Sequence, residues 1–549
     1  MSLPLIPEQS PEQAARAPKG RADNLPVWVI LLLVFFLALR VFDLYEPWAA
    51  GKSGHLSQQL AGAVDDKTMT VLIQSNTQAK AAFSASLGKM DGSAPDAKDL
   101  RAALKEAEAL QLGTQNSPGA ARRVIILRAL LKLPLMGPGR NGLDPAKAFQ
   151  QGALAALPPA DARAYAAEGR LWQDVALGPH LSPAQTSAYA AALRATPNIR
   201  WWLSPALAVL YQSQGDPAAA GRYTKQAQTQ AILTLLPLSL FGLIFSALGL
   251  VGVGLLLYFG IRWWLLRSAL PDSSPPPDVW PTLRETVPPA ERRLRAGDLM
   301  GVFVLYLLMP DLLGWVIGGF SLGHHFGIYL GFHGLLSPFR HRLISAPGDT
   351  RVAANVVLSF VAYLVSAGVP IGLLLLIARR KGASVGEELG WNTHRLGWNL
   401  LYGVGGYAIA LPLLLLAQGI GGFAGTRLHA PTPSNPAMPL LASATTPWVL
   451  VMLVLLATVA APLTEEFLFR GVFYNAAKLR VGVWPAIVLT GLIFGFVHPV
   501  GIAQMLPLAA LGGVFAWMAE TRKSLAPSIL AHCIQNSFAT LMLLLALAG

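Results

Sequence analysis

Long apolar runs recur along the chain and predict membrane-spanning helices. A helix needs about 20 apolar residues to cross the roughly 30 Å of hydrocarbon in a bilayer. Nine stretches reach or approach this length, at roughly 25–42, 231–260, 299–319, 352–378, 398–422, 448–476, 484–498, 502–518 and 525–548. The pattern therefore predicts an all-α fold, a polytopic membrane helical bundle of about nine spans.

Residues 43–228 are of a different kind, rich in Ala, Gln and Leu and interrupted by Pro and Gly. This composition predicts an inserted helical domain, which we place outside the cytoplasm. Near its end, Gly215 is a helix stop, Asp216 an N-cap and Pro217 a first helical residue, which together predict an α-hairpin. The hairpin is similar to a tetratricopeptide hairpin, but the period of about 34 residues is not sustained, so a plain helical bundle is the alternative.

These patterns divide the chain into six segments. They are a cytoplasmic tail (1–24), a transmembrane anchor (25–42), the extracytoplasmic helical domain (43–228), a transmembrane helix (229–262), a Pro-rich cytoplasmic linker (263–297) and an intramembrane core (298–549). We interpret 25–42 as an anchor and not a cleaved signal peptide, because Arg40 and bulky Val41 and Phe42 stand where small cleavage-site residues belong.

Composition and charge agree with a membrane protein. The chain is 53% hydrophobic and only 13% charged, and its net charge is +13. Basic residues concentrate in 262–297 and 379–397, whereas 423–447 carries only Arg427. The positive-inside rule then places the basic loops and the N-terminus in the cytoplasm of a multi-pass protein, which we assign to the bacterial inner membrane. A basic stripe interleaved with aromatic residues is lacking, which argues against nucleic-acid binding.

The segment 324–339 is apolar enough to resemble a tenth span, which would turn the basic 379–397 loop outward. Four histidines, His324, His325, His333 and His341, could form a metal-binding loop there. Histidines scattered among glycines and aromatic residues are more typical of a membrane-surface segment, which is the interpretation that we prefer.

Acidic residues are scarce in 389–549, where Glu465, Glu466 and Glu520 are the only three. Glu520 stands in a basic stretch that we expect to be a loop. The other two are adjacent in an apolar segment. Inserting an ionisable group there costs at least about 2.5–3.5 kcal/mol of free energy, so such a group usually faces the protein interior, where it is paired or has a function. Glu466 and Arg470 are i and i+4 on a helix and can form a pair, whereas Glu465 is turned about 100° away. A structural salt bridge with a spare carboxylate is the plain alternative.

Further polar groups fall at the same depth as these acids. Glu465 is 16 residues before Val481 at a basic turn, and His498 is 17 residues after it. At about 1.5 Å rise per residue, both lie some 24 Å from the turn, so a helical hairpin would bring them level. His532 and Asn536 lie about 15 and 21 Å beyond the last turn and share one helix face. A carboxylate pair, two histidines and an amide at one depth indicate a functional site.

The residue types in this site suit hydrolysis of a carbonyl compound. A desolvated carboxylate such as Glu465 can take a proton from water, and a neutral imidazole such as His498 can orient that water. His532 and Asn536 can donate hydrogen bonds to the oxyanion of a tetrahedral intermediate. Cys533 is a candidate nucleophile, but on a helix it points away from both neighbours and is better interpreted as a small buried hydrophobe.

The three motifs resemble those of the CPBP intramembrane proteases, the group of the type II CAAX prenyl endopeptidase and the lysostaphin resistance protein A-like proteins. The motifs are Glu465-Glu466-Phe-Leu-Phe-Arg470, Phe494-Gly-Phe-Val-His498 and His532-Cys-Ile-Gln-Asn536, and Leu389-Gly390-Trp391 looks like a weaker upstream landmark. The resemblance is dense over about 448–540, and residues 1–297 have no counterpart in it.

The resemblance implies an endopeptidase that hydrolyses a peptide bond of a membrane-associated protein or peptide, as in CAAX-box processing. Glu465 would be the base that activates water with His498, and His532 and Asn536 would support the oxyanion. A second set of residues would support these four, namely Glu466 and Arg470, which would hold the helix and orient the first carboxylate, and Phe494.

Metal dependence stays open in this family. Glu465, His498 and His532 could bind zinc and leave a position for water. The sequence lacks the His-Glu-x-x-His pair that makes a zinc assignment specific, so we favour a mechanism without metal or other cofactor.

Two functions of other classes compete with the protease. One is a non-catalytic membrane scaffold or immunity-type protein that binds a protein partner through residues 43–228. The other is a proton-coupled transporter that uses Glu465 and His498 as a relay, although no inverted repeat is evident.

Overall fold

The computed structural model describes most of the chain from residue 118 onward. The described residues are 118–138, 144–155, 159–177, 181–196, 199–269, 292–318, 320–321, 331–332, 348–393, 395–428, 447–498 and 502–548, with single positions at 101, 104, 108 and 500. They are helical apart from turns and one antiparallel pair of two-residue strands, β1 (Phe320–Ser321) and β2 (Gly331–Phe332). The all-α prediction is confirmed for this part of the chain.

Several predicted segments lie outside the described residues. They are the tail and anchor (1–42), the proline-rich linker between 270 and 291, and the four-histidine segment, in which only the two residues of β2 are described. The predictions for these segments therefore stay predictions.

The chain separates into two compact units. One contains Gly249–Pro433 and Leu455–Asn536, and the other contains Glu46–Leu248 with the short stretches Ser434–Val454 and Ser537–Gly549. We call them the membrane unit and the helical unit.

The helical unit is a bundle of short helices around its own apolar core. Its elements are α6 (Pro118–Leu130), η1 (Pro145–Phe149), α7 (Gln151–Leu154), α8 (Pro159–Leu177), α9 (Pro183–Ala195), α10 (Arg200–Gln214) and the start of α11 (Pro217–Ser268). Ile125, Trp172 and Leu210 lie in the core and are fully buried. Arg122 pairs with Glu168 inside this core, and Trp172 Nε1 donates to the same carboxylate (3.0 Å). A buried charge pair is tolerated here because its hydrogen bonds are satisfied.

The predicted hairpin is present between α10 and α11. Gly215 has φ of +83°, the left-handed conformation that ends a helix, and the backbone N–H of Ala219 donates to Asp216 Oδ1 (2.9 Å). α11 then runs without a break from Pro217 to Ser268, so it contains both the second helix of the hairpin and the span predicted at 231–260.

The membrane unit contains the apolar helices. They are α12 (Ala296–Gly318), α15 (Gly348–Lys381), the short α16 (Val385–Glu388), α17 (Leu396–Arg427), α22 (Val483–Val497) and α23 (Ile502–Arg522). Three more helices belong to this unit in part, namely α11 from Gly249, a long helix over Pro447–Val481 from Leu455, and α24 (Ala526–Ala548) up to Asn536. Each of the eight spans predicted within the described residues coincides with one of these helices.

Four helical segments are long and apolar enough to cross a membrane. They are Leu240–Ser268, Val356–Lys381, Leu396–Gly425 and Pro447–Val481, and Ala296–Pro310 and Val483–Val497 are shorter apolar helices. The chain is therefore an integral membrane protein, while the count of nine spans stays a prediction.

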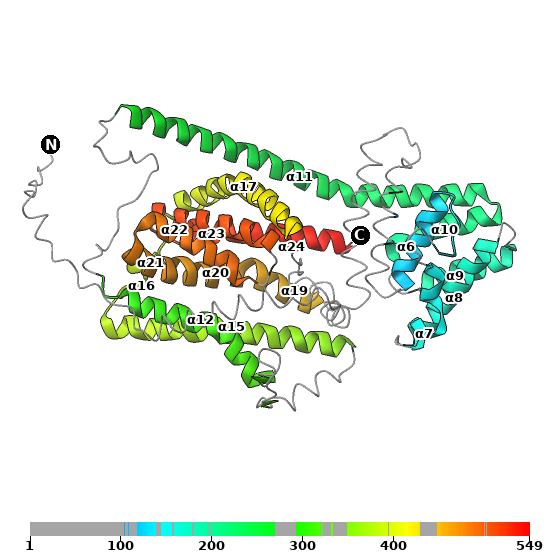
Figure 1. The fold of residues 1–549 in the computed structure, drawn as a ribbon, viewed down its shortest axis with the longest axis horizontal. Coiled ribbons are helices and arrows are strands. Elements are labelled where there is room, and N and C mark those ends of the chain that lie inside the picture. The colour runs from blue at the N-terminus through cyan, green and yellow to red at the C-terminus, as the bar shows by residue number, and fades with distance from the viewer. Residues whose placement is uncertain are drawn as a thin grey trace, which may run out of the picture. The chain divides into compact units, whose positions relative to one another are not determined.

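Helix packing in the membrane unit surrounds the Pro447–Val481 helix. α12 packs beside α15 and against the second half of the long helix, which α22 and α23 also contact (Figure 1). α22 and α23 approach very closely, since a Cβ on Gly491 would lie 2.5 Å from the Ala509 carbonyl oxygen and one on Gly495 would lie 2.4 Å from that of Met505. Small residues permit such close contact between membrane helices.

One local expectation was wrong. Glu520 lies in the last turn of α23 and not in a loop. The helix continues to Arg522 because the polar turn residues begin only with Lys523, whose φ is +49°.

Candidate active site

The acidic pair lies in a long helix that contains two π-helical segments. Pro447–Val481 consists of α19 (Pro447–Leu455), a π-helical segment η3 (Leu456–Ala460), α20 (Ala461–Glu466), a second π-helical segment η4 (Phe467–Tyr474) and α21 (Asn475–Val481). Glu465 and Glu466 are the last two residues of α20, between the two π-helical segments. Such segments widen a helix locally, and they are frequent at functional sites because they redirect side chains and release backbone groups.

Glu466 is the centre of a fully buried hydrogen-bonded chain. Its Oε1 accepts from Arg470 Nη1 (2.8 Å) and from His532 Nδ1 (2.9 Å), and Arg470 Nη2 donates to the carbonyl of Gly512 on α23 (3.0 Å). The predicted i, i+4 pair is therefore present. Its carboxylate contacts His532, whereas the family resemblance would have it orient Glu465.

The hydrogen bond to Glu466 sets the tautomer of His532. Glu466 faces a guanidinium and is therefore a carboxylate, which can only accept hydrogen bonds. Nδ1 of His532 must carry the hydrogen, as in other histidines that a buried carboxylate orients. His532 Nε2 is left to face the rest of the site.

Glu465 is the other group on that side of the imidazole. Its Oε2 lies 3.9 Å from His532 Nε2, and its side chain keeps 16% of its surface exposed while that of Glu466 keeps none. The distance is too long for a direct hydrogen bond, and one water oxygen can reach both atoms. The two carboxylates thus have different environments: Glu466 is fully buried and bonded to Arg470 and His532, and Glu465 is partly exposed.

Phe494 joins the two histidines. Its ring centroid lies 4.7 Å from that of His498 and 5.7 Å from that of His532, and the Arg470 guanidinium carbon lies 4.5 Å from it. The Phe494 carbonyl oxygen is 2.6 Å from His498 Nδ1. A carbonyl only accepts, so this nitrogen carries the hydrogen and Nε2 of His498 has a free lone pair. Among the described contacts, His498 makes no hydrogen bond or ion pair with Glu465.

Asn536 is held by the first π-helical segment. Its Nδ2 donates to the carbonyl of Ala457 in η3 (2.9 Å). The amide has a second hydrogen that this bond does not use. Asn536 thus lies one turn beyond His532 on α24 and contacts the same long helix.

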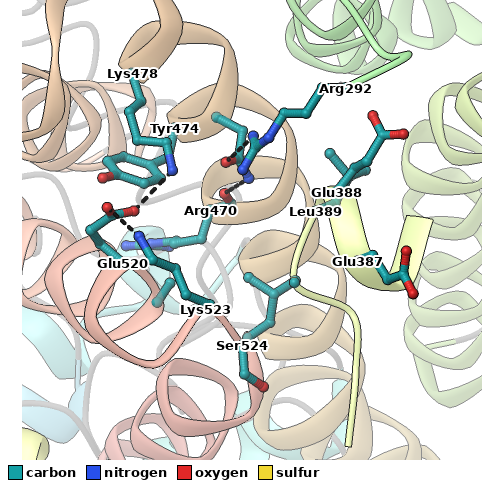
Figure 2. Close-up of a pocket in the computed structure, with 14 residues that line it drawn as sticks. Arg292, Glu387, Glu388, Leu389, Arg470, Tyr474, Lys478, Glu520, Lys523 and Ser524 are labelled. Atoms are coloured by element: carbon teal, nitrogen blue, oxygen red, sulfur yellow. Dashed lines mark hydrogen bonds and ion pairs between the residues drawn. The ribbon is translucent and has the colours of Figure 1, made fainter. Parts of the chain in front are cut away.

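A small polar cavity adjoins the buried cluster. It has a volume of about 30 Å³, and its lining includes Arg470, Lys478, Glu520 and Lys523. Figure 2 shows Glu520 bonded to both lysines beside the Arg470 side chain, with Lys478 Nζ 3.0 Å from the Glu520 carboxylate. The cavity has room for about two waters, if one water needs roughly 10–15 Å³. Arg470 therefore lies between this polar cavity and the Glu466 carboxylate.

The residues proposed for zinc do not form a ligand set. Within the described part of the chain, no group of three or more His, Cys, Asp or Glu side chains could hold a metal ion. Glu465 and His532 face each other, but His498 contacts the cluster through Phe494. The donor geometry therefore does not fit the site that the sequence suggested for zinc.

Two tyrosines near the acids were missed by the sequence analysis. The hydroxyl of Tyr363 on α15 hydrogen-bonds Thr464 Oγ1, and the carboxylate of Glu465 interacts electrostatically with both Tyr363 and Tyr306 of α12. Both tyrosines precede Glu465 by about 100 residues or more. A tyrosine in an apolar span has no spacing signal that would have identified it.

Comparison with known proteins identifies the segment that carries this geometry. Residues 447–538 match the family described as Type II CAAX prenyl endopeptidase Rce1-like. This segment belongs to that family. It contains all three motifs and every member of the Arg470–Glu466–His532 chain.

One curated relative supports the assignment. The protein named "Putative membrane peptidase YdiL" of Bacillus subtilis (strain 168) is 26% identical over 91 residues, which are 17% of this chain and 37% of that protein. The chain thus aligns with little more than a third of the relative's length. No solved structure matches the chain.

Proposed function

We propose that the chain is an intramembrane endopeptidase that hydrolyses a peptide bond of a membrane-associated protein or peptide. The observation that carries the proposal is the Glu465–His532 pair. A partly exposed carboxylate faces, at 3.9 Å, an imidazole that a fully buried carboxylate orients. The family match and the name of the relative support a peptidase of the CAAX type.

Glu465 acts as the general base in the proposed reaction. It removes a proton from a water molecule while the oxygen forms a bond to the scissile carbonyl carbon. His498 accepts the second hydrogen bond of this water at Nε2, since its Nδ1 hydrogen is bonded to Phe494. The C–N bond then breaks, and the proton held by Glu465 passes to the departing amine.

His532 and Asn536 support the developing oxyanion. The Glu466 carboxylate holds the Nδ1 hydrogen and stabilises the imidazolium form, in which Nε2 donates to the oxyanion. Asn536 uses one amide hydrogen to hold Ala457 and offers the other. Arg470 and Phe494 act through packing and hydrogen bonds to these groups.

The proposed mechanism needs no metal ion, and the described side chains include no group of three or more His, Cys, Asp or Glu that could hold one. Its substrate is a protein or peptide at the membrane, and no nucleic acid is involved. A prenylated CAAX sequence is the substrate class that the family description names.

The test compares membranes of cells that carry the wild-type chain with those that carry Glu465→Gln or His498→Ala. Mass spectrometry of new protein N-termini should find cleavage products that only the wild type makes. The variants should be present at equal amounts and unfold at the same temperature. Identical sets of termini in the wild type and both variants would refute the proposal.

The scaffold alternative keeps one structural observation in its favour, which is that the helical unit has a core of its own. It predicts that a cellular phenotype disappears on deletion of 43–228 and survives Glu465→Gln. The protease predicts loss of the phenotype in the Glu465 variant.

A further inference from the structure

Tyr363 ties α15 to the residue that directly precedes the proposed base. Its hydroxyl hydrogen-bonds Thr464 Oγ1. Thr464 Oγ1 also lies 2.9 Å from the Ala460 carbonyl oxygen and 3.0 Å from that of Ala461, and it can only donate to them. Because a hydroxyl has one hydrogen, Tyr363 must be the donor in its bond to Thr464. The phenol therefore fixes the turn of α20 that carries Glu465.

Tyr306 approaches the same turn from α12. Its ring packs edge-to-face on Phe469, with centroids 6.2 Å apart and planes at 88°, and it also contacts Phe303. Phe469 lies about one helical turn after Glu465, so Tyr306 faces the side of the helix on which Glu465 lies. The electrostatic interaction of Glu465 with both phenols agrees with this placement.

The charged groups around Glu465 come from other directions. Glu466 and Arg470 lie on its own helix, and His532 comes from α24. From α12 and α15, the phenol of Tyr363 reaches the residue beside Glu465 and the ring of Tyr306 packs on the following turn. Tyr363 donates its one hydrogen to Thr464 and so acts on Glu465 through this turn, whereas the hydroxyl of Tyr306 can donate to a carboxylate. Near neutral pH neither phenol competes for the proton that a general base must take.

We propose that Tyr306 and Tyr363 are positioning residues for Glu465, which hold its carboxylate toward His532 and the attacking water. The inference rests on the proposed function and extends the site to two helices that lie outside the family-matched segment 447–538. It implies that the peptidase site is incomplete without α12 and α15.

The experiment uses the purified full-length protein in vesicles and a fluorogenic peptide that spans a cleavage site mapped with the wild type. Tyr306→Phe and Tyr363→Phe remove one oxygen each. We expect each to lower kcat about tenfold or more, as the loss of a hydrogen bond near a charge does, and to leave KM within about twofold. The control is Tyr402→Phe, since Tyr402 lies beside the Arg522 guanidinium (5.2 Å) and away from Glu465, and it should keep the wild-type kcat.

A double-mutant cycle separates positioning of Glu465 from a general effect on the fold. In the Glu465→Asp background the carboxylate is withdrawn by one methylene, so removing either phenol should cost much less than it does in the wild type. The inference would be overturned if each tyrosine variant lowered kcat by the same factor in the Glu465→Asp background as in the wild type. An equal loss of kcat in Tyr402→Phe would overturn it too. So would a kcat within twofold of the wild type in both tyrosine variants.

The proposed function and the inference fail in different ways. Cleavage of the peptide by Glu465→Gln at the wild-type rate refutes the proposed function. An inactive Glu465→Gln together with fully active Tyr306→Phe and Tyr363→Phe refutes the inference alone.

Discussion

His532 Nδ1 lies 2.9 Å from Glu466 Oε1, and both side chains are buried. The second glutamate of the acidic pair thus bonds a histidine from another helix, while the first is partly exposed. Because Arg470 neutralises Glu466, this carboxylate can stay ionised in an apolar surrounding and orient the imidazole. Glu465 and Glu466 are therefore adjacent residues of the same type whose different surroundings give them different roles.

Replacing Glu466 by Gln should lower peptidase activity while leaving substrate binding largely intact. The amide no longer stabilises a protonated His532, so we expect kcat to fall at least about tenfold, as when the orienting carboxylate of a triad is replaced. Steady-state kinetics would show this as a loss in kcat with little change in KM. Glu520→Gln is the matched control, because Glu520 pairs with Lys478 and Lys523 outside the site. Equal kcat values for Glu466→Gln and the wild type would contradict the prediction.

Replacing Arg470 by Met should destabilise the membrane unit. The change leaves Glu466 buried without its guanidinium and removes the side-chain donor to the Gly512 carbonyl, so the free energy of unfolding should fall by about 3–5 kcal/mol. Denaturant unfolding in detergent measures the loss. The double variant Glu466→Gln/Arg470→Met removes both charges and should recover part of it, and a double variant no more stable than Arg470→Met would argue against a charge-based cause.

Metal removal should leave the peptidase activity unchanged. Glu465 and His532 face each other, but His498 is linked to them through the Phe494 ring, so the three do not present a shared ligand site. The measurement is the cleavage rate before and after a strong chelator, with the metal content determined on the same samples. Stoichiometric zinc that is lost together with activity would contradict the prediction.

Replacing Gly495 by Ala should separate α22 from α23. The new Cβ would lie 2.4 Å from the Met505 carbonyl oxygen, so the helices must move apart, at a cost of about 1–3 kcal/mol for overpacking. Because Phe494 and His498 are on α22, activity should fall together with stability. Gly405→Ala on α17 is the control, since a Cβ there meets no atom within 4 Å and Ala favours a helix. Wild-type thermal stability in Gly495→Ala would show that the contact tolerates the methyl group.

The position of the apolar helices followed from the sequence because hydrophobic runs are a local property. The helices within the described residues coincide with the predicted spans, and the hairpin at Gly215 and Asp216 formed as its cap residues indicate. The same local rule located Glu465 and Glu466, since charges in an apolar run are rare. Spacing alone also gave the Glu466–Arg470 pair, which needs only one helix.

The separate roles of the site residues depend on tertiary structure. Spacing along one helix cannot tell which carboxylate meets His532, because that contact joins residues 66 positions apart on two helices. Residue spacing places His498 at the same depth as the acids. In the structure His498 packs on the ring of Phe494, and this ring links it to the buried cluster. The winding of η3 and η4, which sets the directions of Glu465 and of the Ala457 carbonyl, likewise had no sequence signal.

The sequence by itself thus determined an all-helical membrane fold, the family resemblance of its C-terminal segment and the set of polar residues that could form a functional site there. Those features depend on composition and on spacing within single helices. Tertiary structure alone decided which of these residues touch, that Glu466 orients His532 while Glu465 keeps part of its surface exposed, and that Tyr363 and Tyr306 contact neighbours of the proposed base on its helix. Contacts between helices depend on how side chains interlock across the bundle, and a linear pattern of apolar and polar residues does not contain that information.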